Sequence, residues 1–203
     1  TGMLQFLIAN ASWLALVRII AASGAAALAG YAIAIRIVIF SLLPSWGLSN
    51  AAAALVGQNL GARRPERAES AVYRTGVFNM VFLGAVGLAF LAAPAPLAGL
   101  FTADAEVIRY AADCLRIISY GYVFYAMGMV LVQAFNGAGD TTTPTLINVG
   151  VYWLLQIPLA WWLALRLGWG ADGAFWAIPT AEGALAVTGW LVFRRGGGKK
   201  QKI

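Results

Sequence analysis

Histidine is absent from this 203-residue chain, a single cysteine is present, and only 11% of the residues are charged. Without histidine, neither an imidazole proton relay nor a Ser-His-Asp or Cys-His catalytic set can form, and one cysteine cannot make an intrachain disulfide. No paired carboxylates and no nucleotide loop after a strand appear, so we expect no enzyme activity, no metal site and no bound cofactor. The scarcity of charge also excludes a water-soluble domain, because 61% of the residues are hydrophobic.

The basic residues that are present gather in two places. The formal net charge is +6, and most of it lies in residues 57–74 and in the last ten residues. Such clusters beside apolar segments match the anionic inner leaflet of a membrane better than a nucleic acid. We therefore expect the lipid bilayer as a partner and no nucleic-acid binding.

Six apolar stretches are long enough to cross a bilayer, which takes about 20 residues in a helix. They cover residues 2–20, 25–56, 71–93, 103–135, 144–165 and 171–193. Pro44 and Gly47 predict a kink in the second stretch, and Pro94 with Pro96 ends the third. The predicted fold class is all-α: an integral membrane bundle of six transmembrane helices over residues 1–195, followed by a basic tail at 196–203.

The orientation of the bundle follows from the basic residues. A loop predicted at residues 57–74 contains four arginines, and short basic loops stay on the cytoplasmic side. Four spans separate this loop from the basic tail, so both face the same side. The prediction is a multi-pass protein of the plasma membrane, the inner membrane in a bacterium, with a cytoplasmic C-terminus.

Two charged residues fall in the middle of predicted spans, where a charge is costly and usually faces a bundle interior or a cavity. Glu182 is central in the sixth span and Arg36 in the second. Glu182 is either a proton or cation site or a hydrogen-bonded group that locks its helix to a neighbour. Arg36 is either its ion-pair partner or purely structural.

Uncharged polar residues also recur within the spans. Asn148, Tyr152 and Gln156 are spaced by four, which places them on one face of the fifth helix, and Gln133 lies near the end of the fourth. Either these side chains line a wet cavity for a substrate or cation, or they form hydrogen bonds between helices.

Five segments carry a family resemblance in their order and spacing. They are YAIAIRI (31–37), LVGQNLGARRPERAE (55–69), AFNGAGDTTTPT (134–145), IPLAWWLA (157–164) and FRRGG (193–197). Together they resemble the MATE family of multidrug and toxin extrusion transporters. The residues of its inner-loop motifs are Gly57, Gln58, Asn59, Gly61, Asn136, Gly137, Gly139 and Asp140.

The resemblance implies a twelve-helix architecture of two six-helix lobes, of which this chain resembles the C-terminal one. It implies export of small organic cations in exchange for H⁺ or Na⁺, with a missing N-terminal lobe as partner, so the chain is expected to be a fragment. The alternatives are a flippase-like transporter of a lipid-linked oligosaccharide and a membrane subunit that has only a structural or assembly role.

The topology predicts which segments a membrane-impermeant thiol reagent reaches in intact cells. Residues 60–70 and 196–203 should be cytoplasmic, and residues 97–104 should be external. Of the single substitutions Ala62→Cys, Gly99→Cys and Gly198→Cys, only Gly99→Cys should label from outside. External labelling of Ala62→Cys would contradict the predicted orientation.

Overall fold

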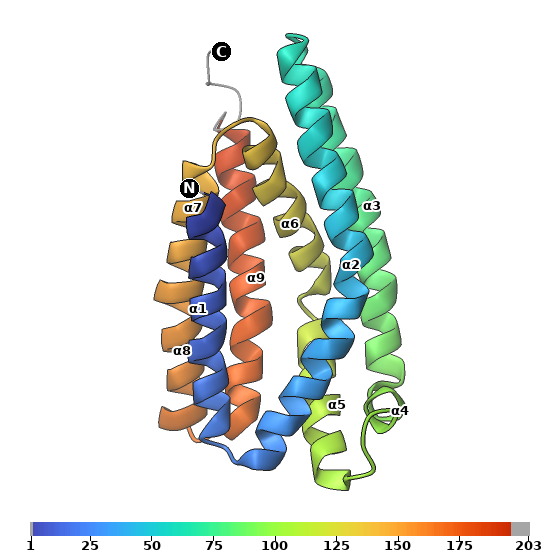
Figure 1. The fold of residues 1–203 in the computed structure, drawn as a ribbon, viewed down its shortest axis with the longest axis vertical. Helices are drawn as coiled ribbons and strands as arrows, with labels where there is room; N and C mark the ends of the chain where they lie inside the picture. Colours follow the sequence, from blue (N-terminus) through green and yellow to red (C-terminus); the bar gives the residue numbers. More distant parts are fainter. Residues whose placement is uncertain (1, 196–203) are drawn as a thin grey trace.

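The computed structural model describes residues 2–195, and the basic tail predicted at 196–203 lies outside the described residues. Within residues 2–195, six helical stretches run along one bundle and no strand forms (Figure 1). Three are single helices at the start of the chain, namely α1 (Gly2–Ala21), α2 (Ala25–Gly61) and α3 (Pro65–Ala92). A short helix, α4 (Pro94–Gly99), leads to a bent pair formed by α5 (Ala105–Ser119) and α6 (Tyr122–Gly137).

The last two stretches run antiparallel to each other. One combines α7 (Thr142–Asn148), the π-helical segment η1 (Val149–Gln156), α8 (Ile157–Trp161) and a second π-helical segment, η2 (Trp162–Arg166). The other is α9 (Gly170–Arg194). The first, fifth and sixth stretches begin and end within two residues of the predicted spans.

The predicted loop at residues 57–74 is wrong, because most of it is helical. α2 continues to Gly61 and α3 begins at Pro65, so only a three-residue turn separates them. Arg63 takes a positive φ of 57° in this turn, and the proline supplies a favourable first helical position. The 37 residues of α2 measure about 55 Å, so its polar end extends beyond a hydrocarbon core of about 30 Å. The hydropathy pattern predicts where the apolar stretch ends, whereas the helix continues past that point to Gly61.

The single fourth helix predicted at 103–135 is also wrong. α5 and α6 meet at an angle of 61° around Tyr120 and Gly121. A Cβ atom at Gly121 would lie 2.6 Å from the Cβ of Pro179 in α9, so only glycine permits this approach. The bend therefore lies where the α5–α6 pair contacts α9, and Pro179 is almost 60 positions from Gly121 in the sequence.

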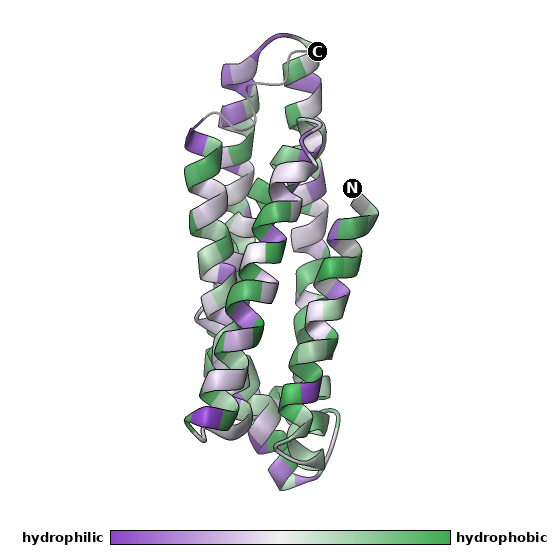
Figure 2. Ribbon diagram, turned by 90° about the vertical axis from the view of Figure 1, so that its left-hand side faces the viewer, coloured by the Kyte–Doolittle hydropathy of each residue, from purple (hydrophilic) through white to green (hydrophobic). Residues whose placement is uncertain are grey.

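Length and composition make four of the described helices candidates to cross a membrane, or five when the bent pair counts as one span. α9 has 25 residues but is not among these candidates, and it carries Pro179, Thr180 and Glu182. Hydrophilic residues gather toward the two ends of the bundle, and hydrophobic ones cover most of its height (Figure 2). We call these ends the 62–64 end and the 22–24 end, after the turns that lie there.

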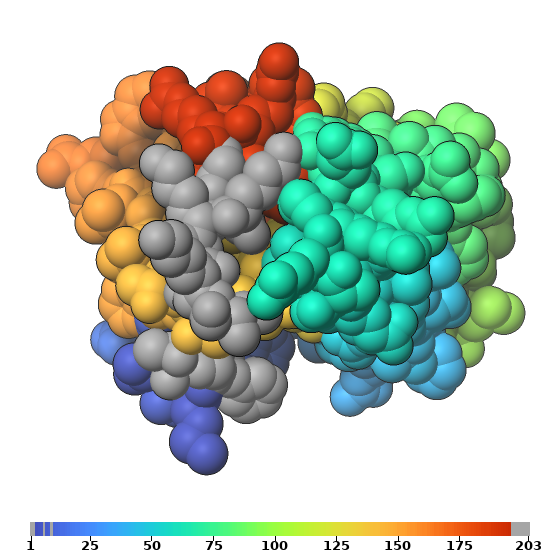
Figure 3. All heavy atoms as spheres, turned by 90° about the horizontal axis from the view of Figure 1, so that it is seen from above, coloured from blue at the N-terminus to red at the C-terminus, as the bar shows by residue number. Residues whose placement is uncertain are grey.

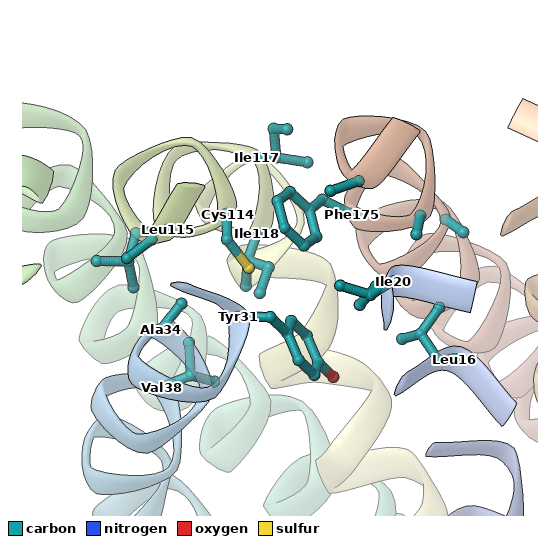
Figure 4. Packing of buried hydrophobic residues seen from close by; sticks show 14 of the residues in the cluster. Leu16, Ile20, Tyr31, Ala34, Val38, Cys114, Leu115, Ile117, Ile118 and Phe175 are labelled. Carbon is teal, nitrogen blue, oxygen red and sulfur yellow. The ribbon is translucent and has the colours of Figure 1, made fainter. Parts of the chain in front are cut away.

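The helices form two groups joined by α6. α1, the 142–166 stretch and α9 make one group, whereas α2, α3 and the bent pair make the other (Figures 1 and 3). α6 packs against α2 and α3 on one side and against α9 on the other. Toward the 22–24 end, Tyr31, Cys114 and Phe175 point toward one another from three helices (Figure 4). The rings of Tyr31 and Phe175 stack with centroids 6.0 Å apart, so the core joins both groups.

A second close approach joins α2 and α6 near the 62–64 end. A Cβ atom at Gly137 would lie 2.7 Å from the Cα of Ala53, and one at Gly57 would lie 3.2 Å from the carbonyl oxygen of Gly137. Backbone atoms cannot rotate aside as a side chain can. The glycines therefore allow the two helices to cross in contact.

This contact predicts that Gly137→Ala destabilises the bundle by about 1–3 kcal/mol, the usual cost of overpacking. Gly47→Ala is the matched control, because a Cβ atom there meets nothing within 4 Å. The control should keep or slightly raise the thermal midpoint in detergent, since alanine favours helix. Equal midpoints for the two variants would contradict the tight crossing.

Candidate functional site

A cavity of about 460 Å³ opens between the two helix groups. Its walls come from α1, α2, α5, α6, η1 and α9, and most of the lining is apolar or aromatic. The aromatic members are Trp13, Tyr31, Trp46, Tyr122, Tyr125 and Tyr152, and the polar ones are Asn10, Ser12, Gln156 and Glu182. Among the described residues that line it, Glu182 is the one with a carboxyl group. The volume lies in the range that encloses drug-sized molecules.

Glu182 is held deep in the cavity wall. Its side chain is buried, with 6% exposure, and lies one turn after Pro179 on α9. The hydroxyl of Tyr152 donates a hydrogen bond to Oε1 over 3.2 Å, and Oε2 has no partner among the described residues. A buried oxygen without a partner costs about 1–3 kcal/mol, so it marks a place where a proton, water or cation completes the site.

Hydrogen bonds fix three further aromatic side chains. The indole nitrogen of Trp13 donates to the hydroxyl of Tyr31 over 3.0 Å. The hydroxyls of Ser41 and Tyr122 lie 2.9 Å apart. Aromatic faces attract cations, and here they surround a single carboxyl group in an apolar setting. Such a lining favours a ligand that combines an apolar body with a positive charge.

Comparison with known proteins identifies the family. A family model described as MatE matches residues 3–162. The chain belongs to the MatE family. A protein of Thermotoga maritima named "Probable multidrug resistance protein NorM" is 29% identical over 175 residues, covering 86% of this chain and 36% of the relative. One of the same name from Pseudomonas aeruginosa is 32% identical over 173 residues, covering 82% of this chain and 35% of the relative.

Solved structures agree on the fold. A structure titled "Crystal structure of MATE in the straight conformation" superposes with a TM-score of 0.87 at 19% identity, over 99% of this chain and 45% of the other. "MATE transporter ClbM in complex with Rb+" gives 0.87 at 21% identity, over 94% of this chain and 44% of the other. The chain thus spans little more than a third of the curated relatives and less than half of the solved MatE structures.

The structure brings three of the predicted site residues together. Glu182, Tyr152 and Gln156 all line the cavity. Asn148 is buried but is not part of the lining. It lies about one turn before Tyr152 along the same stretch, where the lining has ended.

Arg36 does not pair with Glu182. Its side chain is exposed on α2, whereas its neighbours Ile35 and Val38 line the cavity. In the described part of the chain, the ion pair that forms is the one between Arg116 and Asp113, at 3.3 Å. The two charges in the middle of predicted spans therefore lie in different surroundings.

Gln133 lies outside the cavity, in a polar network near the 62–64 end. Its amide nitrogen donates to Oδ1 of Asn50 in α2 over 2.6 Å, and its Oε1 accepts from Asn136 over 2.8 Å. Gln5 of α1 donates to Asn136 and to the carbonyl of Thr141. The network links α1, α6 and α2, and Asn136 is its central member.

The other family-motif residues near this end shape helices and turns. Gly139 has a φ of 80°, and Oδ1 of Asp140 accepts from the backbone nitrogens of Thr142 and Thr143, which caps α7. In α2, Asn59 bonds the carbonyl of its own helix at Leu55.

The remaining motif residues of α2 have no contact with the cavity. Gln58 is exposed, and Gly61 ends the helix. Gly57 and Gly137 make the helix crossing described above. None of the eight motif residues lines the cavity.

Most of the aromatic lining was not predicted. Tyr31, Ile35, Val38, Leu42 and Trp46 lie on one face of α2 at helical spacing. That stripe is a visible signal in the sequence. A stripe facing a cavity and one facing a closed core look alike, however, so it does not identify the site by itself.

Proposed function

We propose that this chain is one lobe of a transporter that exports cationic, amphipathic compounds, and that the cavity around Glu182 binds the cation. The observation that carries the proposal is the buried carboxyl group whose Oε2 lacks a protein partner inside an aromatic cavity. A carboxylate kept only for structure is expected to have both oxygens satisfied. An organic cation supplies the missing charge, and its apolar body matches the walls.

The length of the relatives supports a second lobe. Two relatives named multidrug resistance proteins are almost three times as long as the stretch they share with this chain. With the family resemblance, this supports assigning the chain to the C-terminal lobe, helices seven to twelve, paired with an N-terminal lobe. The cavity then faces a pathway that both lobes line.

A proton is the coupling ion that the lining of this cavity favours. α1 and α6 contain no acidic residue, so Glu182 has no second carboxylate beside it from either helix. A hard metal cation needs several oxygen ligands, whereas one carboxyl accepts one proton. In this scheme the cation and the proton compete for the same group, which makes their binding mutually exclusive and yields exchange.

The scheme predicts that Glu182→Gln in the whole protein lowers ethidium efflux from intact cells about tenfold or more. The substitution removes a charge-assisted contact in a dry site, and the remaining efflux should lose its dependence on external pH. Glu66→Gln is the matched control, because Glu66 is exposed near the 62–64 turn and the chemical change is the same. The control should export ethidium as the unmodified protein does.

The contrary interpretation makes a different forecast. If Glu182 serves only to hold helices together, Glu182→Gln keeps efflux and its pH dependence, and Glu182→Leu lowers the amount of folded protein. That pair of results would refute the proposed site. A further experiment expresses these 203 residues alone, without a second lobe. Drug resistance of the cells that express them would contradict the two-lobe proposal.

A further inference from the structure

A second hollow, separate from the cavity, lies between α1 and the stretch of α8 and η2. It is an open groove of about 530 Å³ toward the 22–24 end. Ala15, Arg18 and Ile19 of α1 and Ala22 of the turn after it line one wall, and Pro158, Trp161 and Leu165 line the other. No residue of this groove lines the cavity around Glu182.

The walls of the groove are mostly apolar. Ala15 of α1 and Ala22 of the turn after it present small side chains, and Arg18 and Ile19 line the same wall between them. Trp161 and Leu165 are half exposed on the facing wall, at 44% and 47%. Within a bilayer, such a groove along two helices is filled by hydrocarbon.

Positive charge lies at this groove without a protein counter-ion. Arg18 is exposed and belongs to the lining. The guanidinium carbon of Arg166 lies 5.1 Å from the ring centroid of Trp161, on the facing wall. No described carboxylate forms an ion pair with either arginine, and no acidic residue lines the groove. Tryptophan and arginine near the ends of spans are typical of headgroup depth.

From the apolar walls and the two arginines together, we propose that the groove binds a phospholipid with a net negative headgroup. Its acyl chain lies along the wall formed by Ala15, Ile19 and Ala22, and its phosphate is bound by Arg18 and Arg166. Guanidinium groups form paired hydrogen bonds with phosphate oxygens, which a net anionic lipid offers without a competing positive charge. This site is independent of the transport proposal.

The test is native mass spectrometry of the whole protein, purified in a neutral detergent and titrated with two lipids of identical acyl chains. Phosphatidylglycerol should bind at least fivefold more tightly than phosphatidylcholine. Arg18→Gln and Arg166→Gln should each weaken phosphatidylglycerol binding about fivefold, the typical effect of one basic residue at an anionic surface. Ala22→Trp should weaken both lipids, because the indole fills the groove.

Arg109→Gln is the matched control. Arg109 is exposed near the same end and stacks on Tyr110 at 4.3 Å, but it lies outside the groove. Equal binding of the two lipids, or an equal loss on Arg109→Gln, overturns the proposal. Competition by sn-glycerol 3-phosphate at the concentrations at which phosphatidylglycerol binds points to a simple anion site and also overturns it. An unchanged thermal midpoint without lipid verifies that each variant is folded. Ala22→Trp tests whether lipid occupies the groove without altering any charge.

Discussion

The contact between Gly121 and Pro179 organises this molecule. It lies where the bent pair α5–α6 meets α9, and it leaves no room for a side chain at the glycine. Because α5 and α6 both pack against α9 of the other group, this contact limits how closely the two groups approach. Both residues line the cavity, and Glu182 follows one turn later on α9. The site therefore depends on a helix break rather than on any single motif.

In the proposed function, the residue that is costly to bury is also the one that binds the ligand. Burying a carboxyl group is unfavourable unless both of its oxygens find partners. Tyr152 satisfies one oxygen only. The polar side chains near the 62–64 end differ from Glu182, because Gln133, Asn136 and their partners form hydrogen bonds with one another. Polarity within the spans thus serves two purposes here, and hydrogen-bond partners distinguish them.

Hydrophobic length predicted the six helical stretches, because crossing a membrane imposes about 20 apolar residues on each. The same criterion placed a loop at 57–74, since it registers where lipid ends and not where a helix ends. It also missed the break at Gly121, because nothing near that glycine shows that a proline from a distant helix will touch it. Local composition therefore predicts where helices form, whereas contacts between segments distant in the sequence determine where those helices bend.

The candidate site was partly predictable for the same reasons. Glu182, Tyr152 and Gln156 stand out as polar residues in apolar stretches, and all three line the cavity. Asn148 fits the same spacing but lies about one turn beyond the lining, and a spacing of four does not show where a cavity ends. Arg36 and Tyr31 lie on different faces of α2. Arg36 is exposed, whereas Tyr31 and the aromatic and aliphatic residues on its face line the cavity.

Anomalous X-ray diffraction from crystals of the whole protein grown with tetraphenylarsonium tests the central claim most directly. Tetraphenylarsonium is a cation with four phenyl groups. The anomalous scattering of its arsenic atom gives the position of the ligand without a model of it. The account predicts an arsenic peak inside the cavity beside Glu182, and loss of that peak in the Glu182→Gln protein. A peak elsewhere with an empty cavity, or one that persists unchanged in Glu182→Gln, would contradict it.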